Sequence, residues 1–584
     1  MTVSTTQNRP RTYPMTVVAQ DPKFRVNGRI LTTTIDVQAE QLAPGPAGAR
    51  VKVIDYDASS GTLYKPFAGC VGKRTGEYAD CLKDRLTNDV IEENPWFHAQ
   101  NVYAITMSTL ARFEKALGRR LAWGFGGHQL YIAPHAFCEA NAFYSEQDRA
   151  LLFGYFPNPF RRQNKTVYCC LSYDIVAHEA THALLDGVRN RFTEPSSLDQ
   201  DGFHEGFADI VALLSVLASK DLVAALLARG SAAHRDTGHL PLHDLAPERL
   251  KQSVLFTLAD EMGEASAEVR GEPLRASLTI PLDTSWRSDE EFAEPHRHGE
   301  LLVAAILHTF ADVWHRRIMK LAEGLGRTGR DAMVQIELLA EEGATAAASL
   351  LNVIIRALDY TAPTHVTYKG FLSALLTADE QVVPDDSRYH YRETLRTTFA
   401  ALGIKPSSRL KGGVWEPVGA HLRYDRVRFE SILRDPEEMY RFIWDNRRAL
   451  EIEDGAYTKV ESVRPVARTT PDGFYVRETV AEYTQRITLP ASRLSRLRIR
   501  QPDALADDEM VTLWGGGTLL FDEYGQVKFH IRNKLLNRDK QEQRLKYLAE
   551  SGYYSEDTAM AATFGRRHLA RMLGTRAFRR NATF

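Results

Sequence analysis

Two apolar segments with polar residues at helical intervals are the clearest pattern in the chain. Apolar residues surround the helical axis on almost every side from Tyr173 onward, which predicts a buried helix over about 173–190. A second apolar segment predicts another buried helix from Glu205 to Val216. Polar side chains inside such helices are costly unless they have partners. The histidines and acids of these two segments are therefore candidates for a site.

Elsewhere the periodicity changes along the chain. Apolar residues at helical spacing predict an amphipathic helix over Asn101–Leu117, which Gly118 ends. Alternating positions predict strands between 24 and 56 and between 121 and 157. Further helices are expected over 299–321, in a block that continues through Leu338 and Leu350 to Leu376, over 391–402 and over 533–550. Further strands are expected over 461–500 and 510–531.

These elements predict an α+β protein with more than one domain. A chain of 584 residues is too long for a single core. We divide it into an N-terminal extension with strands (1–90), a middle domain (91–404) whose part after about residue 203 is helical, and a β-rich C-terminal domain (405–584) with a terminal helix and a basic tail. Residues 220–270 are charged and helical in pattern and carry no site signal.

Composition narrows the class of protein. An apolar fraction of 44% and a charged fraction of 25% are typical of a soluble globular chain. A net charge of −2 gives no reason to expect nucleic acid or an anionic membrane as a partner. The segment 565–580 is rich in arginine and has no acid, which fits a solvated tail or a partner-binding segment. A protein partner could also use the C-terminal domain.

Cysteine usage and the N-terminus bear on location. Five cysteines are few and odd in number, which suits buried thiols in a reducing compartment better than a disulfide framework. The first fourteen residues contain no apolar signal-peptide core, and no run of about eighteen apolar residues follows. We therefore expect a cytoplasmic protein, or one that is exported without a cleaved signal.

The first buried segment contains the sequence His178-Glu179-Ala-Thr-His182. Residues four apart lie on one face of a helix, so both imidazoles can reach one cation. Glu179 can then meet a water that this cation holds. Two histidine ligands, an open coordination position and an adjacent carboxylate predict zinc-dependent hydrolysis. The alternative is a surface helix with solvated histidines, which the apolar surroundings disfavour.

The second buried segment offers a third ligand. Glu205 is the candidate, and Asp209 one turn later can fix the tautomer of His178. Asp186 is a candidate to support His182. The competing interpretation makes Glu205 a first-turn acid favoured by the helix dipole and Asp209 a surface charge.

These residues, in this order, resemble the thermolysin-like zinc metalloendopeptidases of the gluzincin type. That family has the pattern Asp-x-x-x-His-Glu-x-x-His-x-x-x-Asp, followed after a loop by Glu-x-x-x-Asp. Its positions are occupied here by Asp174, His178, Glu179, His182, Asp186, Glu205 and Asp209. The resemblance extends over roughly residues 90–404, through Asn141–Tyr144, Gly271–Ala276, Glu294–Gly299, Arg356–Thr364 and Phe399–Ile404.

The resemblance implies a two-lobed catalytic core, with an N-terminal mixed β lobe that carries the active-site helix and a C-terminal helical lobe. It implies an endopeptidase that holds Zn²⁺ with His178, His182 and Glu205 and uses Glu179 as general base. His296, just before the helix expected over 299–321, matches the family's transition-state histidine, and His298 is its competitor.

Substrate-binding residues follow from the same resemblance. Asn141 and Ala142 match the edge strand that binds substrate backbone, and Arg275 matches the arginine that holds a substrate carbonyl. Ile175 and Leu274 match positions that line the pocket after the scissile bond, which predicts an apolar preference there.

Two departures from the family pattern stand out. The family's oxyanion tyrosine falls near Thr193 here, so His296 is expected to act alone. Val216 replaces a calcium-binding acid, so the paired calcium site is not predicted although Asp174 is present.

Two other functions remain open at this stage. One is a catalytically silent metal-binding scaffold whose site is blocked by residues 220–270 or by the C-terminal domain. The other is a processing protease or toxin with a single protein substrate, which would share all of this chemistry.

Overall fold

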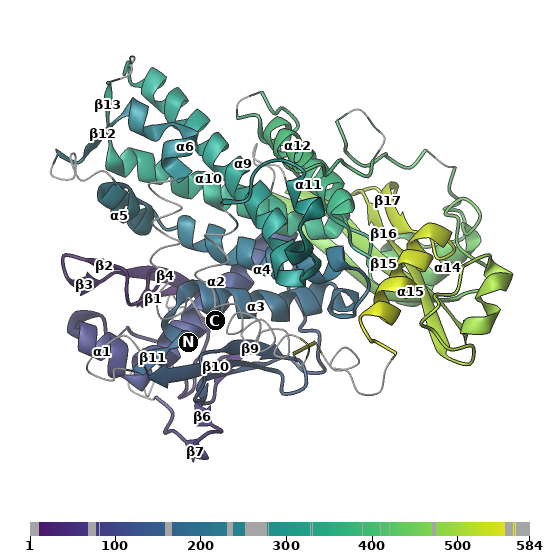
Figure 1. Ribbon diagram of the computed structural model, residues 1–584, viewed down its shortest axis with the longest axis horizontal. Coiled ribbons are helices and arrows are strands. Elements are labelled where there is room, and N and C mark those ends of the chain that lie inside the picture. The colour runs from purple at the N-terminus through teal and green to yellow at the C-terminus, as the bar shows by residue number, and fades with distance from the viewer. Residues whose placement is uncertain are drawn as a thin grey trace, which may run out of the picture.

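The computed structural model of the protein is an α+β structure with three parts (Figure 1): a mixed N-terminal sheet, a helical middle and an antiparallel four-stranded C-terminal sheet. The structure describes residues 11–67, 78–80, 82–157, 166–230, 237–251, 277, 279–327, 329, 331–387, 389–408, 410, 412–419, 421–469, 475–554, 564, 565 and 567. The predicted residues Leu274 and Arg275 lie outside this part of the chain, as do Cys70, Cys81 and residues 568–580 of the basic tail.

The N-terminal sheet has five strands in the order β11-β10-β8-β5, with β9 paired to β10. Strand β8 runs parallel to β5 and β10, whereas β9 and β11 run antiparallel to β10. The strands predicted between residues 121 and 157 are present as β8, β9 and β10. The bounds are β5 (Val51–Val53), β8 (Leu130–Phe137), β9 (Ala142–Ser145), β10 (Ala150–Pro157) and β11 (Thr166–Tyr168).

The long helix α2 (Pro95–Leu117) packs beside this sheet. It begins before the predicted Asn101, because Asn94 caps the backbone N–H of Trp96 and Pro95 suits the first helical turn. It ends as predicted at Gly118, in the left-handed conformation with φ of 65°. The remaining N-terminal elements are the antiparallel pairs β1 (Thr12–Val18) with β4 (Thr32–Gln38), β2 (Arg25–Val26) with β3 (Arg29–Ile30), and β6 (Tyr56–Asp57) with β7 (Thr62–Leu63), and helix α1 (Asn88–Glu93).

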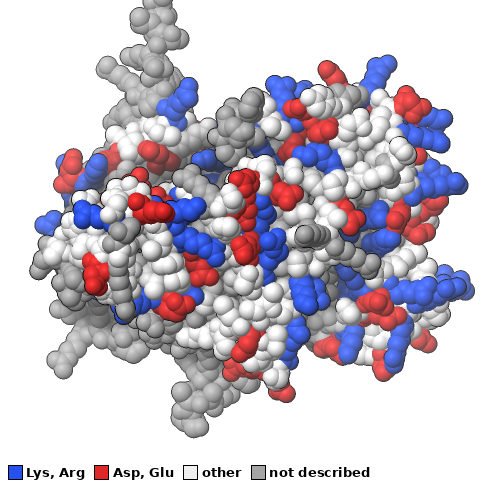
Figure 2. Space-filling view, turned by 90° about the horizontal axis from the view of Figure 1, so that it is seen from above, with Lys and Arg blue, Asp and Glu red and all other residues white. Residues whose placement is uncertain are grey.

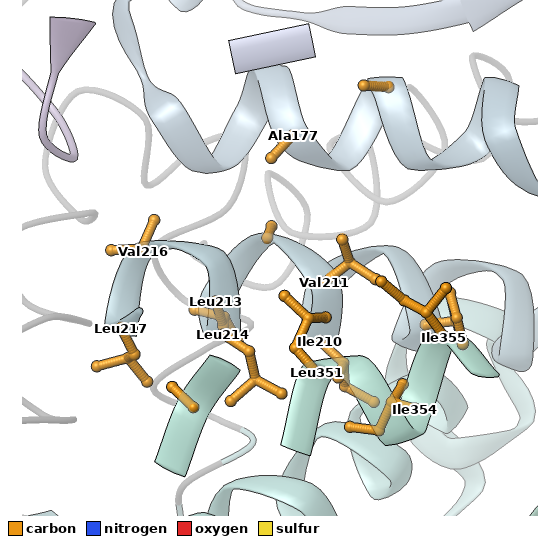
Figure 3. Packing of buried hydrophobic residues seen from close by; sticks show 14 of the residues in the cluster. Ala177, Ile210, Val211, Leu213, Leu214, Val216, Leu217, Leu351, Ile354 and Ile355 are labelled. Carbon is orange, nitrogen blue, oxygen red and sulfur yellow. The ribbon is translucent and has the colours of Figure 1, made fainter. Parts of the chain in front are cut away.

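The helical middle is built around α4, which lies between α3 and α10 (Figure 3). Ala177 of α3, Val211 of α4 and Leu351 of α10 belong to one continuous apolar core. The main helices are α3 (Tyr173–Val188), α4 (Leu198–Leu217), α5 (Lys220–Gly230), α6 (Pro247–Leu250), α9 (Pro295–Gly324), α10 (Ile336–Arg356), α11 (Tyr368–Val382) and α12 (Tyr391–Ala401); β12 (His239–Pro241) pairs with β13 (Met333–Gln335).

The segment Ile336–Tyr360, formed by α10 and the turn that follows it, passes a length-and-hydropathy test for a membrane span. The bent pair α4–α5 passes the same test when taken together. Of the tested part of Ile336–Tyr360, 61% is buried inside the protein. A core helix shows this combination, so the finding is weak evidence for a membrane.

The C-terminal sheet is fully antiparallel, in the order β14-β15-β16-β17. Val466, Val480 and Leu520 join the main core cluster, while other residues of the sheet form two smaller clusters with α14 and α15. The elements are α13 (Phe429–Ile432), α14 (Pro436–Asp445), β14 (Tyr457–Thr469), β15 (Tyr475–Pro490), β16 (Met510–Phe521), β17 (Val527–Asn533) and α15 (Arg538–Glu550).

Buried ion pairs join the three parts. Asp359 is fully buried and accepts two hydrogen bonds from Arg119, at 2.7 and 2.8 Å, and one from Arg468 of β14 at 2.7 Å. Burial opposes ionisation of Asp359, but the two guanidinium groups outweigh it and hold its pKa at about 2. Arg189, just after α3, forms a further ion pair with Glu482 of β15.

Surface charge follows the near-neutral balance of the sequence. Basic and acidic side chains are interspersed over the face in Figure 2, and neither sign covers it continuously. Among the described cysteines, Cys169 and Cys170 are buried, whereas Cys138 is exposed.

Candidate metal centre

Helix α3 places His178 and His182 side by side inside the protein. The imidazoles are 2% and 0% exposed, and their ring centroids are 4.4 Å apart. This follows from the one-turn spacing of the two residues in a helix that is buried along nearly its whole length.

Helix α4 brings Glu205 to these imidazoles. The helix begins at Leu198, earlier than the predicted Glu205, because the Ser197 side chain caps the N–H of Gln200. Glu205 therefore lies in the second turn or beyond, which removes the interpretation of this residue as a first-turn acid. Its Oε2 atom lies 3.6 Å from the Nε2 atoms of both His178 and His182.

The spacing of these three groups fits a metal ion. Their ligand atoms all lie within 4.8 Å of one another. Ligands at about 2.0–2.2 Å from a tetrahedral Zn²⁺ lie about 3.3–3.6 Å apart. The observed 3.6 Å between Glu205 and each imidazole is thus the separation that such an ion requires.

Asp209 lies where the sequence predicts, one turn after Glu205. Its Oδ1 atom is 2.7 Å from Nδ1 of His178. A carboxylate only accepts, so Nδ1 carries the proton and Nε2 presents its lone pair toward Glu205. His178 is thereby held in the tautomer of a metal ligand.

His182 has a neighbour that sequence reasoning missed. Its Nδ1 atom is 2.8 Å from Nδ1 of His204 on α4, and the two rings stack. Asp186, the predicted support for His182, instead accepts a hydrogen bond of 2.8 Å from the hydroxyl of Tyr144. Burial raises the pKa of Asp186 to about 6 although this hydrogen bond opposes the shift. The only signal for His204 was its position directly before Glu205.

Glu179 lies between the cluster and strand β9. Its side chain is fully buried, and Oε2 accepts a hydrogen bond of 3.0 Å from the backbone N–H of Tyr144. That N–H belongs to the edge of β9 that does not pair with β10. The carboxylate next to the candidate ligands is therefore also next to an outer strand edge.

The start of β9 carries the predicted residues Asn141 and Ala142. Oδ1 of Asn141 accepts from the N–H of Ala142 at 2.9 Å. The Nδ2 amide of Asn141 is buried and has no hydrogen-bond partner within the described part of the chain. Ile175, which the resemblance places in the pocket for the substrate residue after the scissile bond, is 1% exposed and lies in the core one turn before His178. The apolar preference for that substrate residue therefore stays a prediction from the resemblance.

The N-terminus of α9 adds a fourth imidazole. Nε2 of His296 lies 3.6 Å from Oε2 of Glu205, and its Nδ1 atom is 2.8 Å from Glu294. Burial opposes ionisation of Glu294, but the hydrogen bond and charge of His296 hold its pKa below the usual value. His298 instead pairs with Asp199 at 2.9 Å and stacks on Tyr368. The structure thus brings His296 to the cluster and places His298 against other residues.

Glycines allow α9 to come this close to α4. A Cβ atom on Gly299 would lie 2.7 Å from the carbonyl oxygen of Gly202 and 3.0 Å from the nitrogen of Gly206. These contacts involve backbone, which cannot move aside as a side chain can. The backbone contact sets the distance between His296 and Glu205.

The variant Gly299→Ala should therefore move α9 away from α4 and lower stability by about 1–3 kcal/mol, as overpacking does. Urea unfolding measures the loss of stability. The matched control is Gly324→Ala on the same helix, where an added Cβ meets nothing within 4 Å. Equal stability of the two variants would contradict the close contact.

A short C-terminal segment lies beside the cluster. The Phe564 ring is 4.4 Å from the ring of His204 and 5.3 Å from that of His182. The N–H of Gly565 donates to Glu146 at 3.0 Å, and a Cβ on Gly565 would lie 2.8 Å from the carbonyl oxygen of Tyr144. This part of the chain therefore runs close to the outer edge of β9.

No protein-family model matches this chain, and no curated protein matches it significantly. The candidate metal centre therefore stands on its own geometry, that is, on His178, His182 and Glu205 converging from two buried helices.

Proposed function

We propose that the protein is a zinc-dependent endopeptidase. The observation that carries the proposal is the placement of Glu179 between three converging ligand atoms and an outer strand edge. Two imidazoles and one carboxylate form a ligand set of catalytic zinc sites, which keep one coordination position open. The resemblance of residues 90–404 to the gluzincin pattern supports the same conclusion.

Each side chain of the site then has one role. Bound zinc would supply a water of lowered pKa and would polarise the substrate carbonyl. Glu179 takes a proton from the attacking water and gives it to the leaving amine. His296 donates a hydrogen bond to the oxyanion, with Glu294 fixing its orientation. Asp209 keeps His178 in its ligand tautomer.

Strand β9 offers an edge that would bind a peptide substrate beside these groups. An extended peptide that adds to the outer edge of β9 would donate to the backbone carbonyls of Ala142 and Tyr144, whose N–H groups are bound to Asn141 and Glu179. The buried amide of Asn141 offers a further donor at the start of that edge. Backbone recognition suits an endopeptidase that acts within a chain.

The direct test combines metal analysis with hydrolysis of casein. The full-length protein should contain zinc, lose hydrolysis when a chelator removes the metal, and regain it when Zn²⁺ is restored. A magnesium-reconstituted sample is the control, because Mg²⁺ prefers oxygen ligands. Zinc-loaded protein that cleaves neither casein nor a broad peptide panel would contradict the proposal.

A second candidate function is a metal-binding scaffold without turnover. The specific observation in its favour is the segment around Phe564 and Gly565, which lies where a substrate strand would approach β9. Bound zinc with equal, negligible turnover in the wild type and in Glu179→Gln would support it.

A processing protease with one substrate shares the proposed chemistry, and capture of proteins on Glu179→Gln would identify that substrate.

Removing the carboxylate of Asp209 should weaken zinc binding by about 10–100-fold, the usual effect of losing the group that orients a ligating histidine. The reason is that His178 would no longer be held with Nε2 free of its proton. Competition with a zinc-binding dye compares Asp209→Ala with Asp221→Ala, an exposed acid on α5. Unchanged affinity in Asp209→Ala would show that Asp209 does not support the centre.

A further inference from the structure

A second group of metal-ligating side chains lies in the N-terminal part. His98 comes from α2, His135 from β8, and Cys170 from the short helical turn Cys169–Leu171 that leads into α3. Their ligand atoms all lie within 4.8 Å of one another. The three residues are 1%, 5% and 0% exposed. Three chain segments far apart in sequence thus place two nitrogens and a sulfur together in the interior.

The hydrogen bonds of the two histidines fix where their protons lie. Nε2 of His98 is 3.0 Å from the carbonyl oxygen of Ile91, which only accepts, so this nitrogen carries a proton. Nδ1 of His135 is 3.0 Å from both carboxylate oxygens of Asp55, so it carries a proton as well.

The remaining two ring nitrogens face each other. Nδ1 of His98 and Nε2 of His135 are 2.8 Å apart. If both rings are neutral, two lone pairs point at one another, which is repulsive. A cation held by both nitrogens removes the repulsion, and Cys170 lies within reach of the same point. Two nitrogen ligands of one tetrahedral zinc lie about 3.3 Å apart, so binding requires the two rings to separate by about 0.5 Å from their hydrogen-bond distance.

The surroundings suit an enclosed site. The Tyr168 ring lies 4.7 Å from His98 and 5.1 Å from His135, and Tyr64 and Tyr155 approach His135 at 6.0 and 6.4 Å. Aromatic rings exclude bulk water and strengthen any charge–ligand interaction inside them.

We propose that His98, His135 and Cys170 bind a second zinc ion, separate from the candidate centre at His178. Nitrogen and thiolate ligands select zinc over calcium or magnesium, which take oxygen. Asp55 and the Ile91 carbonyl hold the outer nitrogens, as the groups behind metal-ligating histidines do. Binding releases one proton, because the Cys170 thiol becomes a thiolate as the sulfur–zinc bond forms.

The position of this second site connects it to the helix that carries the candidate centre. It joins α2 and β8 to the turn that begins α3, the helix of His178 and Glu179. A metal there would stabilise the start of the helix that carries the candidate centre. The competing occupant is a single proton shared between the two imidazoles, which would bind no metal.

Cobalt substitution tests the proposal, because a cobalt–thiolate bond gives a charge-transfer absorption in the near ultraviolet that histidine and carboxylate ligands do not give. The full-length protein loaded with Co²⁺ should show this band. Cys138→Ser, which removes the one exposed thiol among the described cysteines, should keep it, and Cys170→Ser should lose it. Metal analysis after zinc loading should give one zinc fewer per chain in Cys170→Ser than in Cys138→Ser.

The measurements distinguish a second zinc ion from a proton shared between the two imidazoles. A cobalt-loaded wild type without the band, or equal zinc content in the two cysteine variants, would overturn the site in favour of the shared proton. If Cys170→Ser does not fold, His135→Gln replaces it in both measurements. His178→Ala should keep the band, which separates this result from the fate of the proposed peptidase centre.

Discussion

Replacing Glu179 by glutamine should lower the rate of peptide hydrolysis by about a hundredfold to ten-thousandfold, the usual contribution of a general base. Glu179 is not one of the three convergent ligands, so bound zinc should remain. The glutamine oxygen can still accept the hydrogen bond from the Tyr144 N–H, so the local structure should persist.

Single-turnover or steady-state hydrolysis of a casein-derived peptide measures this effect, with zinc content measured on the same samples. The matched control is Glu146→Gln, a carboxylate at the end of β9 that contacts Gly565 instead of the cluster. Full activity in Glu179→Gln would remove the general-base role, even if zinc is present.

Removing the charge of Asp359 should cost about 3–5 kcal/mol of the free energy of unfolding, because it leaves the buried guanidinium of Arg119 without its counter-charge. Arg468 loses one of its two partners and keeps Glu478 at 2.7 Å. Arg119 and Arg468 are 4% and 5% exposed in their side chains, so solvent cannot compensate. Urea unfolding of Asp359→Ala measures the loss. Glu438→Ala, which breaks a surface pair with Arg441 whose side chain is 67% exposed, should cost less than about 1 kcal/mol.

The same carboxylate predicts how stability depends on pH. Its pKa is about 2 in the folded protein, below the ordinary value of 3.8. The lowered pKa means that the stabilisation is complete above about pH 4 and is lost as pH falls toward 2, by about 2 kcal/mol in total. The Asp359→Ala variant should lack this component. A wild type and variant that lose stability in parallel over that range would contradict the assignment.

Local sequence patterns predicted much of the candidate centre. His178 and His182 share a face because four residues make about one helical turn, and Asp209 follows Glu205 for the same reason. Apolar periodicity also located α3, α9 and the two stretches, 461–500 and 510–531, that contain most of the C-terminal strands. Within one helix or strand, the separation of two residues along the sequence determines their relative position in the structure.

Features that depend on packing between distant segments had no such signal. The pairing of Asp186 with Tyr144, and the approach of Phe564 to His204, join residues that only the tertiary fold brings together. The sequence predicted Cys170 only as one of several buried thiols. Its two histidine neighbours come from a helix and a strand whose relative position no short motif encodes. Ser197 is a favourable N-cap before α4, but the prediction that the helix begins at Glu205 did not use it.

Asp359 also bears on how the chain can be divided. Its two counter-charges arrive from opposite directions in the sequence, Arg119 after α2 and Arg468 from β14. A fragment that stops near residue 405 would retain the two hydrogen bonds from Arg119 and would lose the third, from Arg468. This buried contact couples the C-terminal sheet to the helical middle, and we expect the two to melt in a single cooperative transition.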